Sequence, residues 1–200
     1  MDTQVELALA KWPNVPHCYG WLALDARGNW RMRDEQAQRD GRLGERIVHA
    51  SLLAFIKRNY ACDAQGCWYF QNGPQRVYVE LEAAPYVAHM ADGALLLHTG
   101  EPLRQLDAIW LSDRGRIWLQ DQNRIALLDD RDLQRCLHLL AIEEQAVVED
   151  TLDAWLRSAG IAGKLRWRRD EETILVGYLA EEDVSRRFGF ERSPSAVARR

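Results

Sequence analysis

The chain has 200 residues, 47% of them hydrophobic, so it is long enough to bury a core of its own. Its formal net charge of −4 excludes a general attraction to nucleic acid, and no apolar run approaches the roughly 20 residues that cross a bilayer. Residues 1–12 lack the sustained apolar stretch of a signal peptide, so we expect a cytoplasmic protein with reduced cysteines. The expected partner is a small molecule or another protein, with no membrane and no nucleic acid.

The first hundred residues alternate hairpins with helices. Asn72-Gly73 is a favoured turn pair, and Val77, Val79 and Leu81 alternate with polar neighbours as in a half-buried strand. The elements expected here are a helix over residues 4–11, a hairpin of Gly20–Leu24 and Trp30–Arg33, a loop over Asp34–Gly44, a helix over residues 45–59, a hairpin of Cys67–Gln71 and Arg76–Glu82, and a hairpin of Pro85–His89 and Ala94–His98.

The rest of the chain repeats these signals. Asp113-Arg114-Gly115 marks a turn, and Gly160 is a candidate helix terminator. The elements expected here are a hairpin of Ala108–Leu111 and Arg116–Gln120, a strand over Arg124–Leu127, one helix carrying Leu133, Leu137 and Leu140, a second carrying Val148, Leu152, Trp155 and Leu156, a hairpin of Leu165–Arg169 and Thr173–Leu179, and a short helix over residues 181–188.

The order of elements predicts an α+β fold of antiparallel β-hairpins packed with helices. Gly20–Glu82 and Ala108–Leu179 both contain a hairpin, helical sequence and a second hairpin, and WLALDARGNW (21–30) resembles IWLSDRGRIW (109–118). A duplication explains this match, and so does convergence on common turn and strand residues. We expect an N-terminal α+β half (1–100), a C-terminal α+β half (101–190) and a flexible tail (191–200). Two such halves would leave a ligand groove at their junction.

Five segments carry a resemblance to a known family. They are the hairpin Trp21–Trp30, the helix Ile47–Tyr60, the turn Asp63–Trp68, the strand RVYVELEAAP (76–85) and His98-Thr99-Gly100. This pattern, over roughly residues 20–180, resembles an uncharacterised bacterial family of unknown function whose fold consists of repeated hairpin-and-helix motifs. The resemblance implies a ligand-binding or signalling role. It supplies no active site to carry over, and the extended second half of this chain departs from it.

Aromatic and amide side chains around one hairpin suggest a ligand-binding surface. Trp68 and Tyr78 stand on neighbouring strands beside amides and an arginine, while His98 stands at a strand end. The alternative is that these aromatic residues fill the core, since aromatic residues favour strands and buried positions. The candidate ligand-binding residues are Trp68, Gln71, Asn72, Arg76, Tyr78 and His98.

No motif indicates a catalytic, metal or cofactor site. Cys62-x4-Cys67 and Cys136-x-His138 are weak zinc spacings, and buried thiols explain the cysteines better. Gly-x-Ser-x-Gly, the Walker loop and the dinucleotide fingerprint are all missing from the sequence. The basic run Arg166–Arg169 (RWRR) suits a charged edge strand better than a nucleic-acid platform.

Three functions remain open. The first is a non-enzymatic ligand- or protein-binding protein, regulatory or signalling, with no catalytic residue, metal or cofactor. The second is a hydrolase-like enzyme whose site assembles around His98. The third is a structural protein that forms a homodimer through an edge strand.

Overall fold

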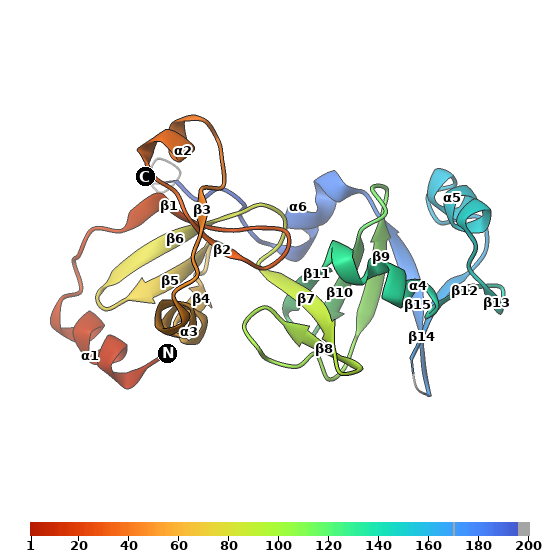
Figure 1. Ribbon diagram of the computed structural model, residues 1–200, viewed down its shortest axis with the longest axis horizontal. Coiled ribbons are helices and arrows are strands. Elements are labelled where there is room, and N and C mark those ends of the chain that lie inside the picture. Colours follow the sequence, from red (N-terminus) through yellow and green to blue (C-terminus); the bar gives the residue numbers. More distant parts are fainter. Residues whose placement is uncertain (170, 196–200) are drawn as a thin grey trace. The chain divides into compact units, whose positions relative to one another are not determined.

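The computed structural model describes residues 1–169 and 171–195, so residues 196–200 of the expected tail lie outside the described part (Figure 1). The chain forms two compact units. Unit 1 comprises Met1–Pro85 and the chain from Gly189 onward, and unit 2 comprises Tyr86–Phe188. The first boundary between the units follows Pro85, whereas the predicted halves divide after residue 100. None of the helices among the described residues is long and apolar enough to span a membrane.

Unit 1 is built on a six-stranded sheet in the order β3-β2-β1-β6-β5-β4. Its apolar side holds the buried residues Leu22, Leu24 and Val79, and Phe70 meets Phe55 of α3 edge to face at 5.3 Å. The elements of this unit are α1 Thr3–Lys11, β1 Cys18–Leu24, β2 Trp30–Met32, α2 Glu35–Arg39, β3 Glu45–Arg46, α3 Ala50–Arg58, β4 Tyr60–Cys62, β5 Trp68–Asn72 and β6 Gln75–Leu81.

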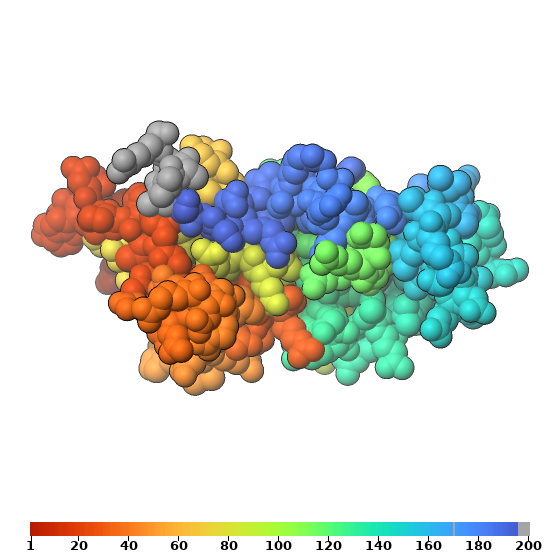
Figure 2. Space-filling model, turned by 90° about the horizontal axis from the view of Figure 1, so that it is seen from above, coloured from red at the N-terminus to blue at the C-terminus, as the bar shows by residue number. Residues whose placement is uncertain are grey.

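Unit 2 is built on a nine-stranded sheet in the order β13-β12-β14-β15-β9-β10-β11-β7-β8. Its core packs Leu111, Leu119 and Trp167 of the sheet with Trp155 of α5, a helix that lies at the surface of its unit in Figure 2. The elements are β7 Tyr86–Ala91, β8 Ala94–Leu97, β9 Ala108–Ser112, β10 Ile117–Asp121, β11 Arg124–Leu128, η1 Asp130–Asp132, α4 Leu133–Leu137, β12 Leu140–Ile142, β13 Gln145–Ala146, α5 Glu149–Arg157, β14 Leu165–Arg169, β15 Glu172–Leu179, η2 Glu181–Asp183 and α6 Val184–Phe188.

The predicted α+β class is confirmed, but the sheets are mixed instead of purely antiparallel. β1 pairs with β6, β9 with β15 and β11 with β7 in parallel, while the other ladders are antiparallel. The first two parallel pairs have one cause. The chain makes a hairpin, crosses through a helical segment and makes further antiparallel strands, and the last strand returns beside the first in the same direction. Each predicted hairpin is present, and the parallel pairs join them.

Six strands of each sheet follow the same order and directions. β3-β2-β1-β6-β5-β4 in unit 1 corresponds to β11-β10-β9-β15-β14-β12 in unit 2. The register corresponds too, because Leu24 lies between Trp30 and Leu81 as Leu111 lies between Ile117 and Tyr178. Strand β13 and helix α5 lie between β12 and β14 in the chain of unit 2.

Three predicted helical or loop segments were wrong in detail. Residues 34–44 are not only loop, because the Asp34 carboxylate accepts a hydrogen bond from the Ala37 amide and starts α2. The helix expected over residues 45–59 begins only at Ala50, because the preceding segment extends the sheet as β3 and leaves Val48 79% exposed. Leu140 begins β12, which pairs with β14, instead of continuing a helix.

Gly177 of β15 lies directly under the ring of Trp110. A Cβ atom at Gly177 would stand 2.5 Å from Trp110 Cε3, closer than van der Waals contact allows. We expect Gly177→Ala to lower the free energy of unfolding by about 1–3 kcal/mol, because the ring must shift within a packed region. Urea unfolding followed by circular dichroism measures this change. In a Trp110→Val background the same substitution should cost much less, and an equal cost in both backgrounds would contradict the steric explanation.

Candidate functional site

The candidate site lies on the side of the unit 1 sheet opposite to α3. Strand alternation separates the two sides, since Phe70 pairs with Val77 while Tyr69 pairs with Tyr78. The second pair shares its side with polar and aromatic residues of the neighbouring strands. We call this side the arginine–aromatic face, and its residues are Tyr19, Trp21, Arg31, Arg33, Tyr69, Arg76, Tyr78 and Glu80.

Tyr78 is the centre of an aromatic cluster on this face. It is 1% exposed and stacks on Tyr19 with ring centroids 4.7 Å apart. Tyr69 meets it at 62°, and the Arg76 guanidinium lies 4.5 Å above the Tyr69 ring. The Tyr78 hydroxyl donates to the Asp63 carboxylate at 3.0 Å. These contacts fix the strand β6 side chains and hold a cation over an aromatic ring, an arrangement that is worth about 0.5–2 kcal/mol.

The charges of the cluster are stable at neutral pH. Burial raises the pKa of Tyr69, and the Arg76 charge opposes this only in part, so the phenol stays neutral. Burial lowers the pKa of Arg76, but the Tyr78 hydrogen bond and the Tyr69 ring outweigh burial, so that this pKa lies above its ordinary value. The cluster therefore presents a permanent cation at Arg76 above the neutral phenol of Tyr69.

A groove of about 530 Å³ lies at the β1–β2 end of the same sheet. Trp21 and Met32 line it and are 44% and 47% exposed. The cations Arg31, Arg33 and Arg42 line it as well. Figure 2 shows the neighbouring α2 segment (orange) at the surface of unit 1. The lining is completed by Asp34, Ala37, Leu43, Gly44 and Glu45.

A bulge in β1 turns Trp21 into this groove. Cys18 pairs with Val77 and Leu22 with Val79, so β1 carries two more residues than β6 over this stretch. Gly20 within the bulge has φ +81°, a conformation that side-chain-bearing residues rarely adopt, and a Cβ there would contact Gln38 of α2. Bulges of this kind re-aim a neighbouring side chain, which explains an exposed tryptophan directly before the buried residues Leu22–Leu24.

The structure brings together some of the predicted site residues. Gln71, Arg76 and Tyr78 share the arginine–aromatic face, although Gln71 is fully buried and its amide donates to the Gly73 carbonyl. Trp68 belongs to the opposite side, where its ring lies 4.8 Å from that of Tyr60. Asn72 is exposed at the end of β5.

His98 belongs to unit 2, whereas the other five candidate residues belong to unit 1. It is 6% exposed, its Nδ1 accepts the Val87 amide at 3.3 Å, and its ring lies 5.9 Å from that of Tyr86. His98 does not line the groove of unit 1. The predicted set of six residues therefore divides between the two units.

Sequence reasoning missed the groove residues Trp21, Met32 and Arg42. Period-two alternation does place Trp21 on the opposite side of β1 from Leu22, which is a usable signal. Met32 lies in β2, and Arg42 lies after α2 in the segment where a loop was expected.

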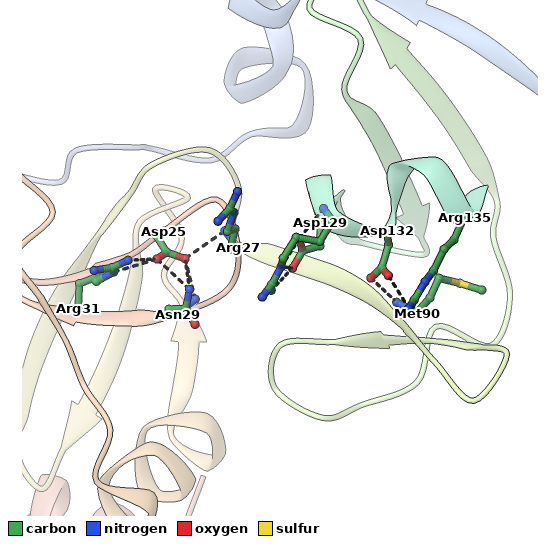
Figure 3. A network of polar contacts seen from close by, with 9 residues as sticks. Asp25, Arg27, Asn29, Arg31, Met90, Asp129, Asp132 and Arg135 are labelled. Atoms are coloured by element: carbon green, nitrogen blue, oxygen red, sulfur yellow. Dashed lines mark hydrogen bonds and ion pairs between the residues drawn. The ribbon is translucent and has the colours of Figure 1, made fainter. Parts of the chain in front are cut away.

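The buried carboxylates of both units are structural (Figure 3). Asp25 of unit 1 caps its turn through the amides of Arg27 and Asn29 and receives the Arg31 guanidinium. Asp129 of unit 2 accepts the backbone amide and the guanidinium of Arg131.

Asp132, also in unit 2, accepts the Met90 amide at 2.8 Å and the Arg135 guanidinium at 3.3 Å. Within residues 1–169 and 171–195 no three carboxylate, thiol or imidazole groups gather as a metal site would require. These carboxylates therefore satisfy backbone amides and arginines of their own units.

The thiols of Cys62 and Cys136 are poor nucleophiles. Burial, helped by the neighbouring carboxylates of Asp63 and Asp132 respectively, raises the pKa of each to about 11. A thiol with such a pKa is protonated at pH 7, whereas reactive cysteines have lowered values. All four cysteines are free of disulfide bonds.

The Asp25 carboxylate stabilises the turn between β1 and β2, and thereby unit 1. Burial opposes its ionised form, but hydrogen bonds from Asn29, Arg31 and Arg27 outweigh burial and lower the pKa of the carboxyl. We expect Asp25→Asn to reduce the free energy of unfolding by about 1–3 kcal/mol at pH 7. Because the folded-state pKa is lowered, this stabilisation is present above the ordinary value of about 4 and is lost as pH falls through the lower folded value.

Urea unfolding of both proteins between pH 7 and pH 2 measures the difference. Asp153→Asn serves as the control, because Asp153 is 53% exposed and pairs only with Arg157 on the surface of α5. A difference for Asp25→Asn that does not shrink on acidification would contradict the proposed role of the carboxylate.

Comparisons with known proteins place the chain in a family and show its fold. The profile of a family described as "Protein of unknown function (DUF2946)" matches residues 1–195. No curated protein matches the chain. The crystal structure of a DUF1285 family protein from Silicibacter pomeroyi DSS-3 is similar with a TM-score of 0.51 and 13% identity, over 88% of this chain and 89% of that chain.

A second DUF1285 family protein, from Shewanella baltica OS155, has a TM-score of 0.40 and 15% identity, over 57% of this chain and 88% of that chain. At such identities the Silicibacter likeness shows a shared fold and nothing about function. These findings confirm the predicted resemblance to an uncharacterised family of unknown function.

Proposed function

The chain belongs to the family described as "Protein of unknown function (DUF2946)", and we propose that it is a non-enzymatic binding protein whose unit 1 groove takes an extended, acidic polypeptide segment. One observation carries the proposal. Trp21 and Met32 are both exposed inside a concave surface that also holds Arg31, Arg33 and Arg42. Tryptophan, methionine and arginine are the residues enriched at protein interfaces, and tryptophan and arginine dominate their binding energy.

Arg42 is the groove cation that favours an acidic partner. Three arginines line it against the two carboxylates Asp34 and Glu45. The Asp34 carboxylate is already occupied by the Ala37 amide at 2.7 Å. Within the described part of the chain, Arg42 forms its ion pair with the exposed Asp40, which contributes little and can exchange for a partner's carboxylate.

Other contacts of unit 1 hold two of the groove arginines in place. Arg33 donates to the Arg42 carbonyl at 2.9 Å, and its guanidinium lies 3.9 Å from Glu80 of β6. Arg31 is held by Asp25 at 2.7 Å. Two of the three arginines are thus positioned before a partner arrives, which reduces the entropy that binding must overcome.

We also propose that the two units derive from one duplicated six-stranded unit. The shared strand order and register support this, and so does the turn between the first two strands. The Asn29 amide donates to the Asp25 carboxylate in unit 1, and the Arg116 amide donates to the Ser112 hydroxyl in unit 2. Ser112, and not Asp113, thus stands where unit 1 has Asp25. A cytoplasmic location, the His98-centred enzyme, the edge-strand dimer and an inter-half groove stay predictions.

The groove is tested with displayed random peptides selected on the intact protein. We expect the selected peptides to combine acidic with apolar side chains. Trp21→Ala should weaken them by about 2 kcal/mol in fluorescence polarisation, because it removes a central aromatic contact. Arg42→Gln should weaken them less, and added salt should remove most of its effect.

Trp12→Ala is the matched control, since Trp12 is 51% exposed beside Lys11 and does not line the groove. It should leave binding unchanged. Peptides that bind Trp21→Ala as tightly as the unaltered protein would refute the proposal, and so would peptides without acidic residues.

A further inference from the structure

A second cavity lies within unit 2 and is separate from the groove. Its volume is about 550 Å³, and it is lined by the β14–β15 hairpin and by the segment between β8 and β9. The hairpin contributes Trp167 and Ile174, and the segment contributes Leu103 and Leu106. A volume of this size accommodates a small organic ligand, and its apolar lining would hold an apolar body.

The indole of Trp167 supplies an unsatisfied donor at this cavity. Trp167 is 1% exposed and its Nε1 has no hydrogen-bond partner among the described residues. A buried donor without a partner is destabilising, so such groups are rare unless a ligand or water accepts from them. Trp155 of the same core shows the usual solution, because its Nε1 donates to the Gly163 carbonyl at 3.2 Å.

Charged side chains of both signs line the same cavity. Arg104, Glu171 and Glu172 line it, and none of their side chains has a hydrogen bond or ion pair to another described residue. Arg169 also lines it, with its guanidinium held by the Gly93 carbonyl at 2.9 Å. A ligand with one charge would leave half of these groups without a counter-charge, whereas a zwitterion would satisfy both kinds.

We infer that this cavity binds a short zwitterionic peptide with apolar side chains. Its carboxylate lies at Arg104, its ammonium at Glu171 and Glu172, and its side chains rest on Leu103, Leu106 and Ile174. A carbonyl oxygen of the peptide accepts the Trp167 indole N–H. The inference concerns a different unit from the groove and does not depend on it.

Calorimetric titration with the dipeptide Leu-Leu tests this site on the full chain. We expect Leu-Leu to bind, and we expect Leu-Leu amide and N-acetyl-Leu-Leu to bind about tenfold more weakly, because each lacks one charge. Arg104→Gln should weaken Leu-Leu about tenfold and leave Leu-Leu amide unchanged. Glu171→Gln combined with Glu172→Gln should do the reverse, affecting Leu-Leu but not the acetylated peptide.

Trp167→Phe keeps an aromatic ring and removes only the donor, so it should weaken all three peptides about three- to tenfold. Arg114→Gln is the control, because Arg114 is an exposed arginine in the β9–β10 turn and does not line the cavity. Thermal melts show that each variant is folded. Equal affinities for the three peptides, no binding of Leu-Leu at about 10 mM, or unchanged binding by a folded Trp167→Phe variant would overturn the inference.

Discussion

The parallel pairing of β1 with β6, and of β9 with β15, is the constraint on which both units depend. Parallel neighbours cannot be joined by a tight turn, so the chain between them must leave the sheet and come back. In unit 1 that excursion contains α2, β3 and α3, and in unit 2 it contains α4 and α5. The excursions supply the helices that cover the apolar sides, and one of them forms the rim of the groove.

The two sides of the unit 1 sheet have different compositions and different roles. One side meets α3 through Phe55 and is a conventional core. The other side carries stacked tyrosines and arginines that are held by Asp25, Asp63 and Glu80. Ion pairs and aromatic contacts position these side chains, while the exposed Trp21 on the same side remains open to a partner. Stability and recognition thus come from opposite sides of the same strands.

Much of the fold could be predicted from the sequence, because its signals are local. Alternation of apolar and polar residues located the hairpins, and glycines at positive φ, such as Gly28 and Gly115, located their turns. Short elements were missed because they depend on distant partners: β3 exists only by pairing with β2, and α2 has one buried residue.

The candidate site was harder to predict for the same reason. Period-two alternation is enough to place Arg76 and Tyr78 on one side of β6, whereas the bulge at Gly20 that exposes Trp21 depends on the register between β1 and β6. Register across a parallel pair is a long-range property, and no local pattern in either strand encodes it. The lack of a hydrogen-bond partner for the Trp167 indole likewise depends on residues that are distant in the sequence, so no local pattern predicts it.

The last described segment of the chain, beyond Phe188, belongs to unit 1. The Glu191 amide donates to the Gly66 carbonyl, and the Leu81 amide donates to the Arg192 carbonyl. Unit 2 is therefore an insertion within unit 1 in the order of synthesis. A ribosome completes all of unit 2 before it releases the residues that satisfy Gly66 and Leu81, so unit 2 can mature first and unit 1 must wait until Glu191 and Arg192 have emerged.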